Sequence, residues 1–128
     1  MGYYTNYSMS IYKNDENITT YDIVNTIKNL MEKEKGMFYP FENEIKRMCD
    51  DEDNKKFYDI DLDSYQTKWY EYAEDMCKLS SCFPSVIFQL DGEGEENGDL
   101  WTAWYKNGKQ VIHCAEIIIK PLDEKEFK

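Results

Sequence analysis

Residues 69–109 constrain the fold more than any other part of the chain, because three of the four connections there carry their own turn signal. A helical spacing of apolar residues runs up to Pro84, which cannot continue a helix. Two alternating strand patterns follow, separated by an acidic loop rich in glycine, and Asn107-Gly108 is a strong two-residue hairpin signal. This segment therefore predicts a helix followed by an antiparallel meander.

Capping residues place the helices. Thr19 or Thr20 caps a helix whose apolar stripe falls within 23–31, and Gly36 is placed to end that helix. A second helix is expected from a cap at Thr67 up to the proline.

Residues 37–56 leave two alternatives open: a short strand interrupted by Pro40, or one or two helical turns. Elsewhere, alternation of apolar and polar residues predicts strands. The expected strands are 3–12, 57–63, 85–91, 100–106 and 109–120.

The resulting order, β-α-(β)-β-α-β-β-β, is typical of an α+β fold. We expect a single domain over 1–128, with an antiparallel sheet and both helices on one face. This arrangement resembles a ferredoxin-like sandwich with an added C-terminal β-hairpin. The other sheet face is then either solvated or used for association. The last strand is apolar on both sides, which favours a homodimer through it; its apolar residues include Ile112, Ile117, Ile118 and Ile119.

The charge balance limits the partners. The chain has 26 Asp and Glu against 15 Lys and Arg, a net charge of −11, and Arg47 is its only arginine. Direct binding to nucleic acid or to anionic lipid needs clustered positive side chains, so both are disfavoured. Electrostatic attraction instead favours a protein partner with a basic surface.

Cysteine and histidine usage predicts no metal and no cofactor. The 4 cysteines form no CxxC pair, and His113 is the single histidine, which does not match a zinc site. We expect reduced thiols in a cytoplasmic protein. The opening residues lack the regions of a signal peptide, and no apolar run approaches the ~20 residues of a membrane span. The cysteines are Cys49, Cys77, Cys82 and Cys114.

Alternate aspartates in the expected strand 57–63 give one candidate binding site. Asp59, Asp61 and Asp63 share one strand face, with neighbouring carboxylates roughly 6.7 Å apart. A row of carboxylates at that pitch imitates a nucleic-acid backbone. The plainer interpretation is a strand with its apolar side in the core and its acidic side in water.

The loop 91–99 offers a second set of carboxylates. Glu96 occupies the position where an EF-hand needs glycine, which argues against calcium. Adjacent carboxylates on an exposed turn rarely have the pocket that acid–base catalysis requires. We expect either a solvated hairpin tip whose glycines allow positive φ, or a contact loop for a basic partner. The carboxylates expected in contact are Glu93, Glu95, Glu96 and Asp99.

Trp101 and Trp104 lie on opposite faces of one expected strand. One should be in the core, and the other is available to a pocket or an interface. A nucleotide-stacking pocket lacks support, because no phosphate-binding glycine loop with nearby Lys or Arg is present. His113 is expected to be a hydrogen-bonded, half-buried residue rather than a catalytic partner of Cys114.

The opening MGYYTNYSMSI and a set of short motifs within 67–109 form a recognisable pattern. The motifs are Trp69-Tyr70, Asp75-Met76, Leu79-Ser80, Phe83-Pro84, Phe88, the GEGEE run from Gly92, Gly98-Asp99, Trp101 and Asn107-Gly108-Lys109. They resemble small uncharacterised proteins carried by phages and mobile genetic elements. A weaker likeness, centred on Thr67-Lys68-Trp69, is to the ferredoxin-like domain of Api92-like phage proteins. The resemblance leaves 37–60 unmatched, implies a compact α+β fold in a mobile-element setting, and carries no catalytic residues.

These features predict a binding protein rather than an enzyme. We expect a small acidic phage or mobile-element accessory protein that docks on a basic surface of a host defence protein and inhibits it, in the manner of an anti-CRISPR. The expected contacts are the three aspartates, the loop carboxylates and the two tryptophans. One alternative is a binder that holds a small ligand, such as a nucleotide signal, on an aromatic sheet face. Another is a structural homo-oligomer.

Overall fold

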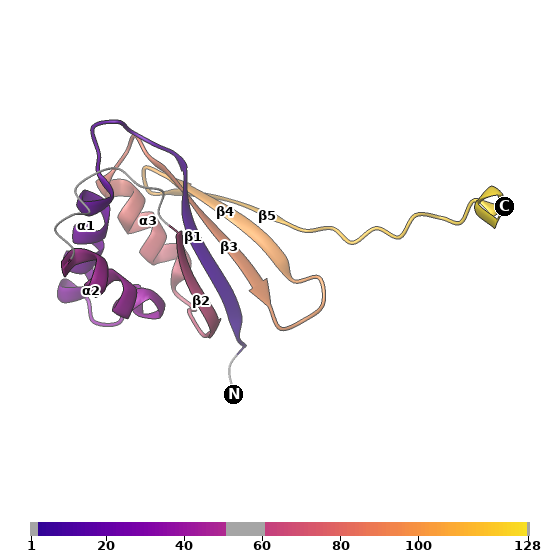
Figure 1. Cartoon of the computed structure of the whole chain (residues 1–128), viewed down its shortest axis with the longest axis horizontal. Helices are drawn as coiled ribbons and strands as arrows, with labels where there is room; N and C mark the ends of the chain where they lie inside the picture. Colours follow the sequence, from indigo (N-terminus) through magenta and orange to yellow (C-terminus); the bar gives the residue numbers. More distant parts are fainter. Residues whose placement is uncertain (1–2, 51–60, 128) are drawn as a thin grey trace.

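The computed structural model describes residues 3–50 and 61–127. Its elements are β1 (Thr5–Lys13), α1 (Thr20–Lys33), the 3-10 turn η1 (Tyr39–Phe41), α2 (Glu42–Asp50), β2 (Asp61–Thr67), α3 (Tyr72–Cys82), β3 (Ile87–Gly94), β4 (Leu100–Lys106), β5 (Lys109–Cys114) and the 3-10 turn η3 (Glu124–Phe127). A 5-stranded sheet has the order β2-β1-β3-β4-β5, and the described α-helices all lie over one face of it (Figure 1). The predicted α+β class is confirmed.

The sheet is antiparallel throughout. β1 pairs with both β2 and β3, so these two strands run parallel to each other on either side of it. α3 connects them, which makes a split β-α-β unit of the kind that a ferredoxin-like sandwich contains twice. β3, β4 and β5 continue as a meander, so the added C-terminal hairpin is present. Within the described ranges, no helix has the length and apolarity needed to cross a membrane.

Local chemistry places α1 where the sequence predicts it. Thr19 is the N-cap: its hydroxyl accepts a hydrogen bond from the Asp22 amide at 3.1 Å. The Asp22 carboxylate accepts one from the Thr19 amide at 3.0 Å, which completes a capping box. The helix ends at Lys33, earlier than expected, and Gly36 lies in the following turn with a φ of +95°.

The predicted start of the next helix is wrong. Thr67 does not cap a helix, because it pairs with Thr5 at the end of β2. α3 begins only at Tyr72, so Trp69 lies in the connecting loop although its apolar spacing suggested a helix face. The strand alternative for 37–56 is also wrong in its described part, where η1 and α2 form instead.

The last strand is shorter than predicted. β5 ends at Cys114, where it pairs with Trp101, and the amide of Ala115 donates to the Leu100 carbonyl at 2.7 Å. β4 begins at Leu100, so residues after Ala115 have no neighbouring strand on that side. At the other edge of the sheet, the part of the expected strand 57–63 that precedes β2 lies outside the described residues.

Trp69 is the centre of the core between sheet and helices and is 1% exposed. The rings of Tyr7, Phe38 and Phe41 surround it, with centroids 5.3, 5.6 and 5.4 Å away. The indole Nε1 donates to Asp75 Oδ2 at 2.8 Å, and the Phe38 amide donates to the same oxygen at 3.2 Å. The Asp75 carboxylate therefore joins the loop before α3 to the start of η1.

Burial sets the titration of Asp75, which is 5% exposed. Burial raises the pKa of its carboxyl above the ordinary value of 3.8, and the two hydrogen bonds from Trp69 and Phe38 lower it in part. Because the pKa is higher in the folded state than in the unfolded state, the ionised carboxylate costs stability at neutral pH. That cost falls as the pH drops through the folded-state pKa and vanishes below the unfolded-state pKa.

Asp75→Ala should lower the free energy of unfolding by about 2–4 kcal/mol, because two buried donors lose their acceptor. Asp75→Asn keeps a carbonyl oxygen for both donors and removes the cost of ionisation. Its free energy of unfolding should therefore fall much less than that of Asp75→Ala. Urea unfolding at pH 7 and pH 4 measures both effects. The wild type should gain stability relative to Asp75→Asn as the pH falls. Equal decreases in the free energy of unfolding for the two variants at pH 7 would contradict this account.

Candidate functional site

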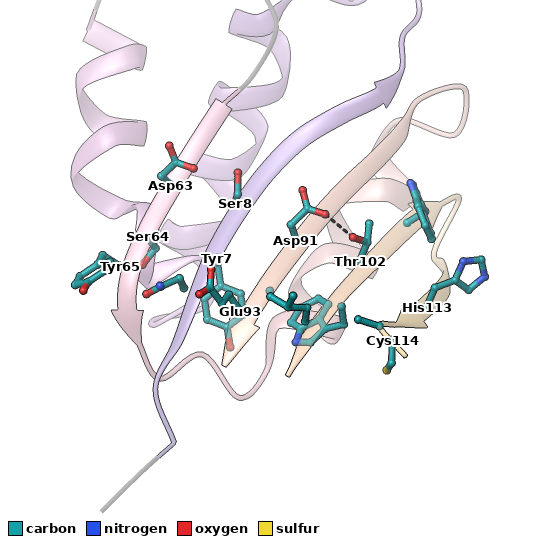
Figure 2. Close-up of a pocket in the computed structure, with 16 residues that line it drawn as sticks. Tyr7, Ser8, Asp63, Ser64, Tyr65, Asp91, Glu93, Thr102, His113 and Cys114 are labelled. Carbon is teal, nitrogen blue, oxygen red and sulfur yellow. Dashed lines mark hydrogen bonds between the residues drawn. The ribbon is translucent and has the colours of Figure 1, made fainter. Parts of the chain in front are cut away.

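The sheet face that the helices leave open carries the candidate site. The cross-strand register aligns a row of side chains on this face, one from each strand: Asp63, Ser8, Asp91, Thr102 and His113. Figure 2 shows this row running across the sheet. Asp63 and Asp91 flank Ser8, and they stand roughly 10 Å apart because neighbouring strands are spaced by about 4.8 Å.

A hollow with a volume of about 660 Å³ lies over this row. Tyr65 lines it at the β2 edge, and Glu93 lines it near the hairpin between β3 and β4 (Figure 2). Trp104 and His113 line it on the side of β4 and β5. The described lining residues include acidic side chains but neither lysine nor arginine, so the hollow is suited to a cation rather than to a phosphate.

A chain of hydrogen bonds fixes Asp91 in this hollow. Thr102 Oγ1 donates to Asp91 Oδ1 at 2.6 Å, and Gln89 Nε2 donates to both carboxylate oxygens at 3.3 and 3.2 Å. Trp104 Nε1 in turn donates to Gln89 Oε1 at 3.0 Å. Since a carboxylate has about four acceptor positions, Asp91 can still accept a donor on Oδ2.

An aromatic group borders the acidic row. The Trp104 ring contacts His113 edge to face, with ring centroids 5.0 Å apart. The ring of Tyr12 packs against Trp104 in a similar geometry, with centroids 6.3 Å apart. His113 is exposed instead of half-buried, as are all the residues of the edge strand β5. The π-faces of these rings attract cations.

Trp101 lies on the helix-covered face, as the predicted alternation requires. Its ring stacks on Tyr72 with centroids 4.8 Å apart and planes 22° apart. It also lies against Gly92, where an added Cβ would come within 2.1 Å of Trp101 Cε2. Trp101 is thus engaged in the fold, although it also lines the hollow, and Trp104 is the tryptophan on the open face of the sheet.

The hairpin tip uses part of its acidic loop to hold the N-terminal residues. Glu95 Oε1 accepts a hydrogen bond from the Tyr4 amide at 2.9 Å, and Asp99 Oδ2 accepts one from the Tyr3 hydroxyl at 2.5 Å. The bond to Asp99 raises the pKa of the Tyr3 hydroxyl. The Glu96 carboxylate is exposed and, among the described residues, has no hydrogen-bond or ion-pair partner.

Negative charge gathers on the open side of the sheet. The ion pairs in the described part of the chain are Lys46–Glu42 at 2.9 Å and Lys78–Glu34 at 2.5 Å, and both involve residues of the helical layer. The described lysines of the sheet stand at strand ends; they are Lys13, Lys106 and Lys109. The open-face carboxylates are therefore not neutralised by described lysines.

The predicted aspartate row is only partly described. Asp59 lies outside the described residues, Asp61 lies in β2 opposite Ser10, and Asp63 is exposed on the open face. The row that the structure does place runs across the strands. It adds Ser8 and Thr102, which sequence reasoning missed, and Asp91, which the sequence analysis assigned only to the acidic loop 91–99. The alternating patterns of β1, β3 and β4 put these three on one face, but only the sheet order makes them neighbours.

Within residues 3–50 and 61–127, no three His, Cys, Asp or Glu side chains lie close enough to hold a metal ion. No protein-family model matches the chain, and searches of curated proteins and of solved structures gave no match.

Gly92→Ala should lower the free energy of unfolding by about 2 kcal/mol, because the added Cβ displaces the Trp101 ring from its stack on Tyr72. The same substitution in a Trp101→Ala background has room for the Cβ and should cost less than about 0.5 kcal/mol. Denaturant unfolding of the wild type, the two single variants and the double variant gives the coupling free energy between positions 92 and 101. An equal cost in both backgrounds would show that Trp101 does not restrict position 92.

Proposed function

We propose that this chain is a protein-binding module, not an enzyme, whose open sheet face and hairpin tip bind a surface rich in Lys and Arg. The observation that carries the proposal is the set of carboxylates around a hollow of about 660 Å³, without a neutralising lysine or arginine among its described lining residues. The net charge of −11 adds long-range attraction to a basic partner.

The geometry of the hollow suits a basic side chain. A guanidinium that enters it meets the oriented carboxylate of Asp91, which keeps acceptor capacity on Oδ2. The ring of Trp104 beside it adds a cation–π contact. Asp63, two strands away, offers a second carboxylate to another basic group of the same partner. Glu93 and Glu96 extend the acidic surface toward the hairpin tip.

The partner that we propose is a nucleic-acid-binding protein of a host cell, because such proteins carry Lys and Arg where they contact phosphates. Carboxylates that occupy those side chains compete with the nucleic acid and so inhibit the partner. The resemblance of residues 67–109 to proteins of phages and mobile elements supports a host defence protein as the target, with an anti-CRISPR-like effect.

A small ligand in the hollow is the second candidate function, since its volume falls within the roughly 300–1,000 Å³ of small-molecule sites. The acidic lining favours a cationic ligand over a nucleotide. Thermal-shift measurements with spermidine and with cyclic and linear nucleotides separate the two ligand classes. A saturable rise in Tm with a nucleotide would favour a nucleotide-sequestering protein over the proposed protein-binding module.

Removing charge from the open face should weaken binding of a nona-arginine peptide about tenfold and reduce the dependence of its Kd on salt concentration. The test variant combines Asp63→Asn, Asp91→Asn and Glu93→Gln, which line the hollow. Fluorescence anisotropy over a series of salt concentrations measures both quantities.

The matched control removes the same charge from the helical layer through Glu32→Gln, Glu71→Gln and Glu74→Gln, all exposed residues. It should bind the peptide nearly as the wild type does. Equal losses of peptide affinity in both triple variants would mean that only net charge matters, and the proposed binding face would be rejected.

A further inference from the structure

The chain after β5 leaves the sheet and projects away from the rest of the molecule (Figure 1). Ala115 makes the last backbone hydrogen bond to the sheet, and residues 116–122 make none with the described part of the chain. Ile117, Ile118 and Ile119 are 70%, 76% and 89% exposed. Three adjacent β-branched residues favour a strand, and in water they gain from any pairing that buries them.

The sequence of this segment is complementary to itself in the antiparallel direction. When two copies align about a twofold axis at Ile118, Glu116 of each stands opposite Lys120 of the other. The same alignment puts Ile117 opposite Ile119. Directly opposed pairs of opposite charge, and of β-branched residues, stabilise antiparallel strands. Charge complementarity therefore identifies a second copy of this chain as the partner of the segment.

We propose that residues 116–120 pair with the same residues of a second copy and form a twofold-symmetric homodimer. Pro121 lacks a backbone N–H and ends the pairing. The pairing also covers backbone groups that a strand next to an exposed edge leaves free. This inference does not depend on the proposed binding to a basic partner, because the two surfaces share no residue.

The dimer is expected to be weak and reversible. A single strand pair buries less than the roughly 1,200 Å² of a stable interface, and two copies that each carry −11 repel one another. The Glu116–Lys120 pairs and the isoleucines must therefore supply the specificity. Sedimentation of the full chain over a dilution series should show a mass that rises from 15.3 kDa toward twice that value.

Charge reversal tests the register. Glu116→Lys places lysines opposite each other, Lys120→Glu places glutamates opposite each other, and each should raise the dimer Kd about tenfold. The double variant Glu116→Lys/Lys120→Glu restores opposed charges and should return to a Kd near that of the wild type. The two single variants change net charge in opposite directions, so a change in overall repulsion cannot weaken both.

Cross-linking gives a second measurement. With the exposed Cys82 and Cys114 changed to Ser, Ile118→Cys should form a disulfide-linked dimer in mild oxidant. Residues opposed on antiparallel strands have Cα atoms about 4.5–5.5 Å apart, within the range of a disulfide. Ile117→Cys is the matched control: it opposes Ile119 rather than itself and should cross-link more slowly.

A monomer at every concentration would overturn the dimer. A dimer that is unaffected by the single reversals, or one that the double variant does not restore, would overturn the antiparallel pairing of residues 116–120. The charge-reversal variants leave every residue that lines the hollow unchanged, so binding of the nona-arginine peptide should persist in them. Unchanged peptide binding after the removal of charge from the open face would reject the proposed function and leave the dimer standing.

Discussion

The buried carboxylate of Asp75 organises the side of the molecule that the helices cover. It lies in α3 and accepts hydrogen bonds from Trp69 and from the Phe38 amide, so three segments meet at one oxygen. Phe38 has a φ of 51°, a left-handed conformation that is uncommon outside glycine and is held here by this contact. Because all the described helices gather around this point on one face of the sheet, the other face stays open (Figure 1).

Sheet order then converts separate polar residues into one surface. Ser8 lies between Asp63 and Asp91 because β1 runs between β2 and β3, although the chain visits these strands in a different order. The hydrogen bond from Thr102 to Asp91 depends in the same way on the register of β3 with β4. Sequence alternation could assign Asp63 and Trp104 to candidate surfaces, but their neighbours follow only from the pairing of distant strands.

The sequence predicted elements well where their causes are local. The capping box at Thr19 and the hairpin at Asn107-Gly108, with φ angles of 47° and 79°, depend on residues a few positions apart. The prediction from the sequence was wrong at Trp69, whose apolar spacing suggested a helix. Burial of that indole depends on a hydrogen bond to Asp75 and on rings from distant segments, which no local pattern reveals. The predicted length of the last strand was also wrong, because β5 ends where its partner strand β4 begins.

The proposed dimer and the proposed binding face influence each other through charge and symmetry. A twofold-symmetric dimer carries two copies of the open face. A partner with two basic patches can then engage both faces, and the second contact benefits from a high effective concentration. Dimerisation brings together two chains that each carry a net charge of −11, and a basic partner neutralises part of that charge. Binding of the partner and pairing of the two copies should therefore favour each other, by the reciprocity that links any two coupled equilibria.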